Sequence, residues 1–263
     1  MNYAGSAAQP PEFLQLLGHE VRWQLLKALA FTDMHVQELV EAVKRPQNLI
    51  SYHLRKLHAH GVVREHRSIA DGREVYYSLD LDRVRASLLD AGGSLHPALG
   101  RDSGPVPGQA GEEREKTIRV LFLCTHNSAR SQIAEGILRS KSGGKIDVRS
   151  AGTEATQIHP LAVRALAEMN IDIRGQHSKS LEQFIGQHFD YIITVCDRAK
   201  ESCPVFPGDP VRIHWSFPDP AAVEGTEEAQ FQAFRETSVQ MMTRISYLLL
   251  MIQREHGLRL EGG

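Results

Sequence analysis

The first candidates for a reactive site in this chain are Cys124 and Arg130, which are separated by five residues. The apolar run 120–123 comes directly before the cysteine and is typical of a strand buried in a parallel sheet. A helix is predicted over 132–138, so residues 124–131 form a loop between a strand end and a helix N-terminus. Backbone N–H groups in such a loop converge on one point and suit a tetrahedral oxyanion. The pair therefore predicts a nucleophilic thiolate beside an arginine that binds the anion.

The other loop residues are expected to support this anion site. Ser131 is placed to donate a hydrogen bond to Cys124, and with Arg130 it should lower the pKa of the thiol. A cysteine and an arginine at this spacing also occur by chance, and a buried structural cysteine is the alternative. The residues expected to support the oxyanion loop are Thr125, His126, Asn127, Ser128, Ala129 and Ser131.

Two further cysteines complete the thiol content of the chain. Cys196 follows the strand-like run 191–195, and Cys203 comes seven residues later. Both are expected beyond the carboxyl end of a strand, where ligands bind in open α/β sheets and where the Cys124 loop lies. They could be unrelated buried cysteines, and a zinc site is disfavoured because zinc usually takes four ligands at closer spacing. The third interpretation is a thiol relay, in which one thiol attacks the oxyanion, a second displaces it, and the third takes the disulfide to the surface.

A carboxylate between two prolines is the remaining candidate in this half. Asp219 follows the strand-like run 211–217, and at a strand end it is placed to act as a general acid. A turn or helix-capping aspartate is the alternative. The pattern of residues 226–254 then predicts a long amphipathic helix that packs on the sheet. We expect no metal site among these residues.

The N-terminal part has a different pattern. Apolar residues recur at helical spacing in 13–17, 21–30 and 36–43, and Pro46 suits the start of a further helix in which Ile50, Leu54 and Leu57 form one buried stripe. Strand-like runs 62–69 and 74–79 flank an Asp-Gly turn, which is typical of a hairpin. This order predicts a winged helix-turn-helix.

Positive charge concentrates on the second helix of the turn and the wing. Seven basic and two acidic side chains lie between residues 44 and 73, a net charge of +5, although the whole chain carries −2. Such a surface suits phosphate contacts that hold a helix face against base edges. A solvated basic surface on a protein-interaction domain is the alternative. The expected DNA-binding residues are Gln47, Asn48, Ser51, Tyr52, Arg55, Lys56, Arg67 and Arg73.

Length and composition agree with two domains. The chain has 263 residues, of which 41% are hydrophobic and 24% charged, as in globular proteins. The Gly- and Pro-containing stretch 92–116 predicts a linker between a mainly helical domain with a β wing, 1–91, and an α/β domain with a four-stranded parallel sheet, 117–263. No apolar run approaches the roughly 18 residues of a membrane span, and residues 1–11 lack the features of a secretion signal. We therefore expect a cytoplasmic protein that does not contact a membrane.

The N-terminal half resembles the ArsR family of metalloregulatory repressors, a resemblance carried by residues 17–22, 47–57 and 61–63. It implies binding to operator DNA, a homodimer formed through this domain, and release from DNA when a metal or metalloid binds. The sequence departs from arsenic-responsive members because residues 34–39 contain no cysteine, and a zinc-sensing pattern is not evident in 80–96. His53, His58, His60 and His66 are expected to face DNA or the surface, so the sensed species stays open.

The C-terminal half resembles the low-molecular-weight tyrosine phosphatase superfamily and, within it, the thioredoxin-coupled arsenate reductases. The resemblance spans about 117–256 and is carried by 124–131, 150–153, 159–160, 177–178, the Cys196 and Cys203 pair, and 214–220. It implies that Cys124 is the nucleophile, Arg130 binds the arsenate or phosphate-like oxyanion, and Asp219 protonates the leaving oxygen. It also implies that Cys196 and then Cys203 carry the relay, with thioredoxin as electron donor and no bound cofactor. Because the two α-carbons of a disulfide lie about 4.4 to 6.8 Å apart, the segment between the two cysteines must leave any helical geometry, and we expect it to be mobile.

Potassium-binding members of this family use Asn, Glu, Ser and Asp. Asn127, Glu135 and Ser150 match, whereas Ser180 stands in place of the Asp and Lys179 lies beside it. The resemblance therefore does not support potassium binding, and Lys179 is the candidate for the positive charge.

Two other functions compete with a repressor fused to an arsenate reductase. A protein tyrosine phosphatase fused to a regulator would share Cys124, Arg130 and Asp219, but it needs neither Cys196 nor Cys203. Phosphatases also commonly have a tyrosine after Asp-Pro, where this chain has Ala221. The other alternative is a non-catalytic sensor whose two later cysteines capture arsenite or become oxidised.

Overall fold

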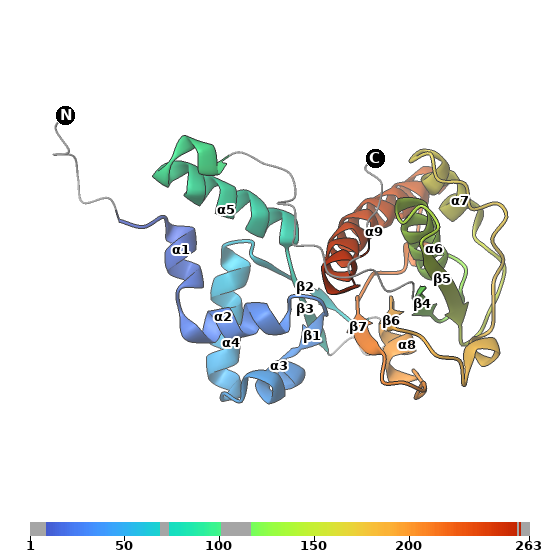
Figure 1. Ribbon diagram of the computed structural model, residues 1–263, viewed down its shortest axis with the longest axis horizontal. Coiled ribbons are helices and arrows are strands. Elements are labelled where there is room, and N and C mark those ends of the chain that lie inside the picture. The colour runs from blue at the N-terminus through green and yellow to red at the C-terminus, as the bar shows by residue number, and fades with distance from the viewer. Residues whose placement is uncertain (1–8, 69–73, 101–116, 257, 259–263) are drawn as a thin grey trace. The chain divides into compact units, whose positions relative to one another are not determined.

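The structure is a computed structural model, and it describes residues 9–68, 74–100, 117–256 and 258. The chain folds into two compact units. Of the described residues, 9–67 and 74–100 belong to the N-terminal unit and 117–256 to the C-terminal unit. Figure 1 shows the elements of both units along the chain.

The N-terminal unit is a helical domain with a small antiparallel sheet, as predicted. The sheet has the order β1-β3-β2 and the hairpin register pairs Val63 with Leu79. The helices bury an apolar core that includes Leu25, Leu39 and Leu54. The elements are α1 (Glu12–Leu17), α2 (Glu20–Ala28), β1 (Met34–His35), α3 (Val36–Val43), α4 (Gln47–Ala59), β2 (Val63–Arg67), β3 (Val75–Leu79), α5 (Leu81–Leu95) and the 3-10 helix η1 (Pro97–Gly100).

Helix α4 is the expected second helix of the turn. Ile50, Leu54 and Leu57 are fully buried, which confirms the stripe predicted from their spacing. Gly61 follows the helix with a φ of 67°, a conformation that costs glycine little, and it turns the chain into the wing. The hairpin turn, including Arg73, lies outside the described residues.

The boundary predicted after residue 91 falls inside a helix. Helix α5 continues to Leu95 and η1 follows at once, so the beginning of the stretch 92–116 is helical and not a linker. Gly92 packs against η1, since a Cβ there would lie 2.9 Å from the carbonyl oxygen of Leu99. Composition alone misjudged these residues because glycine served for close packing there. The division 1–91, 92–116 and 117–263 stays a prediction.

The C-terminal unit is an α/β domain whose parallel sheet has the order β5-β4-β6-β7, which confirms the predicted fold class. The strands are β4 (Ile118–Cys124), β5 (Ile146–Gly152), β6 (Tyr191–Thr194) and β7 (Val211–His214). The helical elements are α6 (Arg130–Lys141), α7 (Pro160–Ala167), η2 (Leu181–Phe184), α8 (Asp197–Glu201), η3 (Pro220–Ala222) and α9 (Glu227–His256).

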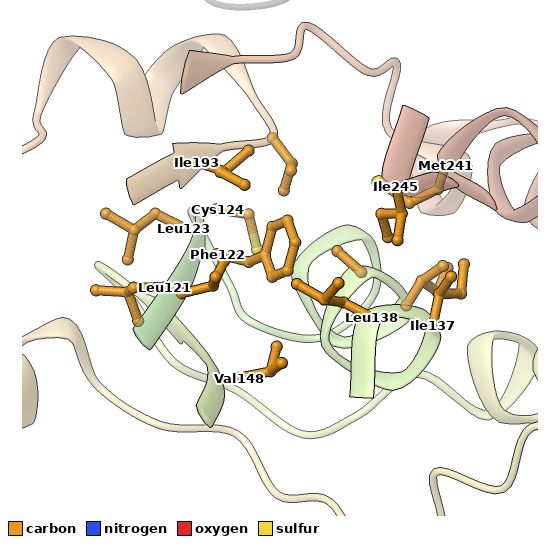
Figure 2. Close-up of a cluster of buried hydrophobic side chains, with 14 of the residues drawn as sticks. Leu121, Phe122, Leu123, Cys124, Ile137, Leu138, Val148, Ile193, Met241 and Ile245 are labelled. Atoms are coloured by element: carbon orange, nitrogen blue, oxygen red, sulfur yellow. The ribbon is translucent and has the colours of Figure 1, made fainter. Parts of the chain in front are cut away.

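The core lies between this sheet and its helices. Figure 2 shows Phe122 of β4 directed toward Leu138 of α6, with Met241 and Ile245 of α9 beyond. Burying each such side chain contributes roughly 1.5 to 3 kcal/mol, which is enough to fix the ends of the strands against the helices. This packing matters for the site because Cys124 is the last residue of β4. Among the described residues, no helix combines the length and apolar character needed to cross a membrane.

Candidate active site and nucleic-acid interface

The loop between β4 and α6 surrounds the Cys124 sulfur with donors. The Sγ of Cys124 lies 2.8 Å from the Ser131 hydroxyl and accepts a hydrogen bond of 3.1 Å from the backbone N–H of Asn127. Asn127 has a φ of 46°, in the left-handed region that asparagine tolerates better than most residues. This conformation turns the loop around the sulfur. The predicted strand, loop and helix are therefore all present.

The pKa of Cys124 differs in direction from the expectation. Complete burial raises the pKa of the thiol, the nearby Cys196 raises it further, and Arg130 and Ser131 oppose this by lowering it. The sequence showed the two stabilising groups but not the desolvation, which dominates. The thiolate consequently depends on each of these donors.

Arg130 joins the loop to the segment that carries Asp219. Its guanidinium donates to the Phe217 carbonyl at 2.9 Å and to the Asp219 carboxylate at 2.8 Å. Asp219 in turn accepts a hydrogen bond from the backbone N–H of Ala221. The Asp219 carboxylate, which follows β7, is thus held beside Arg130, the first residue of α6.

Arg130 has one buried donor without a hydrogen-bond partner among the described residues. The donor is Nε, on a side chain that is itself buried. A buried donor without a partner costs about 1 to 3 kcal/mol, and a tetrahedral oxyanion in the loop would offset that cost. The loop beside Cys124 can therefore bind an oxyanion next to a sulfur nucleophile.

A buried polar cluster lies behind the loop. The Asn127 amide donates to the hydroxyls of Ser131 and Ser150, at 2.9 and 2.8 Å. Ser150 donates to the Glu135 carboxylate, which also accepts from the Lys179 ammonium at 3.1 Å. Hydrogen bonds thus connect the Lys179 charge with the hydroxyl beside Cys124.

This cluster does not fit a potassium ion. The Nζ of Lys179 binds Glu135 and also donates to the His177 carbonyl, so a cation already lies among the oxygens that an ion would need. Ser180 caps η2 by accepting from the N–H of Glu182. No group of three or more His, Cys, Asp or Glu side chains suited to a metal occurs in the described part of the chain.

Two residues of the site were not expected from their spacing. The Gln132 amide donates to the backbone and side-chain oxygens of Asn127, and its position in the first turn of a buried helix was the only signal. Gly152 lies against the loop, because a Cβ there would be 2.6 Å from the Thr125 carbonyl oxygen. Glycine is thus required at the end of β5 for the loop to approach.

The other loop residues contribute mainly backbone. Thr125, His126 and Ser128 accept hydrogen bonds through their carbonyl oxygens from Glu154, Thr156 and His159. Ala129 is the N-cap residue of α6 and is 3% exposed, and its methyl side chain supplies no polar group to the site. His126 lies 3.6 Å from Glu154 at the rim of the loop.

The structure brings Cys196 to the same edge of the sheet. Strands β4 and β6 are parallel neighbours, with Leu123 opposite Thr194. Cys124, the last residue of β4, and Cys196, two residues after β6, therefore lie at the same end of the sheet. The Cys196 sulfur is buried and lies 3.4 Å from the Thr125 hydroxyl. Two thiols expected to act in succession therefore adjoin one loop.

Cys203 lies farther along, beyond α8. It is half-buried, whereas Cys124 and Cys196 are buried, and all three cysteines are free thiols. The short helix α8, between Cys196 and Cys203, is the segment that a disulfide between them would have to rearrange.

The expected DNA-contacting residues of α4 share one face of the helix. Gln47, Asn48, Tyr52, Arg55 and Lys56 are exposed and Ser51 is half-buried, opposite the buried stripe. Arg67 is exposed at the end of β2.

One histidine expected on the surface or at DNA is buried instead. His53 is 3% exposed and its ring lies 4.4 Å from the ring of His19. Burial lowers the pKa of His53, and the residue belongs to the core and not to the predicted surface. The helical spacing already placed it next to Leu54, at the edge of the buried stripe.

Comparison with known proteins identifies both halves. Residues 119–257 match the model of the low molecular weight phosphotyrosine protein phosphatases. The chain belongs to this family. Residues 19–65 match the arsR family of bacterial regulatory proteins, so the N-terminal unit contains a helix-turn-helix domain of that type.

Several relatives of the second domain carry the name arsenate reductase. One from Halalkalibacterium halodurans is 43% identical over 126 residues, covering 48% of this chain and 91% of the relative. Another from Bacillus cereus is 42% identical over 134 residues, covering 51% and 96%. A solved thioredoxin-dependent arsenate reductase from Corynebacterium glutamicum is 31% identical with a TM-score of 0.42, covering 53% of this chain and 63% of that one.

Proposed function

We propose that this chain is a transcriptional repressor fused to an arsenate reductase that converts arsenate to arsenite through a three-thiol relay. The observation that carries the proposal is the position of the thiols. Cys124 lies inside the oxyanion loop, Cys196 lies 3.4 Å from Thr125 of that loop, and Cys203 follows one short helix later. Relatives at 43% and 42% identity that are named arsenate reductases support the same substrate.

The first step uses the loop and Asp219. The Cys124 thiolate attacks the arsenic of arsenate, Arg130 binds its oxygens, and Asp219 protonates the oxygen that leaves as water. The contact between Arg130 and Asp219 supports the position of the acid, since it holds the carboxyl group beside the proposed anion site. Asp219 has to take up a proton, from solvent or from the arriving arsenate, before it can protonate the leaving oxygen.

The next steps transfer two electrons. The Cys196 thiolate attacks the Cys124 sulfur, a disulfide forms, and the electron pair of the sulfur–arsenic bond stays on arsenic, which leaves as arsenite. The Cys203 thiolate then attacks the Cys196 sulfur and releases Cys124 as a thiolate. Thioredoxin, a dithiol, would reduce the resulting Cys196–Cys203 disulfide and so complete the cycle.

The test is arsenate-dependent NADPH oxidation coupled through thioredoxin and thioredoxin reductase. The wild type should turn over, whereas Cys196→Ser and Cys203→Ser should stop after one arsenate or before it. Full turnover by both variants would contradict the relay and favour a protein tyrosine phosphatase with incidental thiols.

The first domain is proposed to bind operator DNA as a homodimer. The exposed face of α4 and the match to the arsR family support this role. Addition of arsenite to a complex of the full chain with operator DNA should release the DNA. Persistence of the complex at inducing arsenite concentrations would contradict arsenite as the inducer. Arsenite release of DNA without steady-state reduction would instead identify a sensor.

A further inference from the structure

Cys203 differs from the other two thiols in its surroundings. Its sulfur lies 3.6 Å from Nη1 of Arg212 and 3.8 Å from the Pro204 carbonyl oxygen. The same guanidinium donates through Nη2 to the Pro204 carbonyl at 3.1 Å. The Arg212 side chain thus contacts both Cys203 and Pro204. These residues lie at the end of the segment that a Cys196–Cys203 disulfide would have to rearrange.

Arg212 is suited to such a contact by its place in the sheet. It belongs to β7, which lies at the edge of the parallel sheet, and its side chain is exposed. Within the described residues it forms no ion pair with a carboxylate, so its charge is not neutralised by another side chain there. The contact between Arg212 and Cys203 therefore connects two parts of the domain. One is β7, which the core holds in place, and the other is the segment that contains α8.

We propose that Arg212 is a positioning residue for the last step of the relay, in which it holds Cys203 and stabilises the thiolate that attacks Cys196. The inference rests on the proposed reductase function and assigns the group that makes the third thiol reactive. In that step the Cys203–Cys196 bond forms, the Cys196–Cys124 bond breaks, and Cys124 takes the electron pair as a thiolate. No further oxidant is required.

The electrostatics of Cys203 show why a cation is needed. Burial raises the pKa of the thiol, and the Arg212 guanidinium beside it lowers the pKa in part. The core residues behind Cys203 are apolar. Lys200 and Glu201, at the end of the preceding helix α8, carry opposite charges. The charged group that acts on the pKa of Cys203 is Arg212. Arg212 is therefore the charge that opposes desolvation of the thiolate.

The experiment measures alkylation of Cys203 by iodoacetamide in the full-length protein between pH 6 and 10, with the modified peptide quantified by mass spectrometry. Arg212→Gln should move the alkylation profile to higher pH and slow the reaction about fivefold at neutral pH, the size expected for a partly exposed charge pair. The rates should converge at high pH, where the thiolate is complete without help. Arg212→Lys should keep most of the effect. Arg198→Gln, which removes a positive charge from α8, is the matched control and should follow the wild type.

A second measurement follows the same chemistry in the relay. After one arsenate equivalent, the Cys196–Cys203 disulfide should form more slowly in Arg212→Gln at neutral pH and recover at higher pH. An alkylation profile unchanged by Arg212→Gln, or lowered by the same factor at every pH, would overturn the proposal. Alkylation needs no arsenate, so this outcome is distinguishable from failure of the reductase function, which the cysteine variants test.

Discussion

Desolvation and hydrogen bonding act in opposite directions on Cys124. The buried sulfur favours the neutral thiol, while the Ser131 hydroxyl at 2.8 Å, the Asn127 N–H and Arg130 favour the thiolate. A nucleophile in this position is reactive only as long as those donors are in place. Single atoms around the sulfur therefore determine the pH at which the site works.

Ser131→Ala should raise the pKa of Cys124 further, because it removes a donor to the thiolate and leaves burial unchanged. Since the thiolate is the reactive form, the acidic limb of the pH–rate profile should move to higher pH. Activity at neutral pH should fall about tenfold, the equivalent of one pKa unit, and recover on the alkaline side. The measurement is the pH dependence of arsenate reduction. Ser142→Ala, at the far end of α6, should leave the profile in place.

The elements around the loop set its shape. The end of β5 lies so close that Gly152 has no room for a side chain, and the cluster of Asn127, Glu135, Ser150 and Lys179 fixes the back of the loop. Glu135, Ser150 and Lys179 do not touch the sulfur. They act by holding the backbone N–H groups and the Ser131 hydroxyl in place.

Gly152→Ala should displace the oxyanion loop. The new Cβ would lie 2.6 Å from the Thr125 carbonyl and 2.7 Å from the Asn127 nitrogen, distances that backbone atoms cannot accept without moving. Because displacements of about 1 Å can cost on the order of a hundredfold in rate, kcat should fall by about that factor. Arsenate kinetics and phosphate binding measure the effect. Gly175→Ala, which meets nothing within 4 Å, is the control, and equal activity of the two variants would contradict the close approach.

Lys179→Met should remove the buried cation of Glu135 and leave the exposed Arg139 as its remaining partner. Lys179 and Glu135 are nearly inaccessible, at 8% and 2% exposure. Loss of one partner of a buried pair costs about 3 to 5 kcal/mol when the other charge is left alone, so with Arg139 present the loss of stability should lie below that range. Urea unfolding should show the loss in the free energy of unfolding. Potassium should partly restore activity in the variant, whereas wild-type activity should be the same in potassium and sodium salts. Lys145→Met, at an exposed position just before β5, should change neither property.

At the scale of the whole molecule, two families share one chain, and the three cysteines all lie in the second. No cysteine is left for metalloid binding in the regulatory domain itself. If arsenite is the inducer, it has to act through other ligands or through the thiols of the reductase domain. A linkage between arsenate reduction and DNA binding would therefore have to be measured on the full chain.

Lys56→Ala should weaken DNA binding by removing a phosphate contact. The affinity should fall for operator and unrelated DNA alike, and the slope of log K against log salt should decrease by about one. Fluorescence anisotropy over a series of salt concentrations measures both quantities. Lys141→Ala removes the same charge from the exposed surface of the reductase domain and serves as the control. A loss confined to operator DNA would instead indicate contact with a base.

Features that depend on local spacing could be predicted from the order of the residues. Cys124 and Arg130 belong to one continuous loop, and the α4 stripe follows from a helical period, so neighbouring residues along the chain were sufficient to predict them. The alternation of strands and helices also predicted a parallel sheet. Family resemblance then assigned the later steps of the thiol relay to Cys196 and Cys203 and the role of general acid to Asp219. These roles stay predictions.

Features that depend on residues far apart in sequence became visible only in the folded chain. The order of the strands brings Cys196 beside Thr125, and the loop after β7 brings Asp219 to Arg130. Burial of His53 and the raised pKa of Cys124 arise from atoms that surround these residues from several elements. Desolvation and ion pairing are set by all neighbours in three dimensions, so a one-dimensional pattern reveals which groups could interact but not which of their opposing effects is larger.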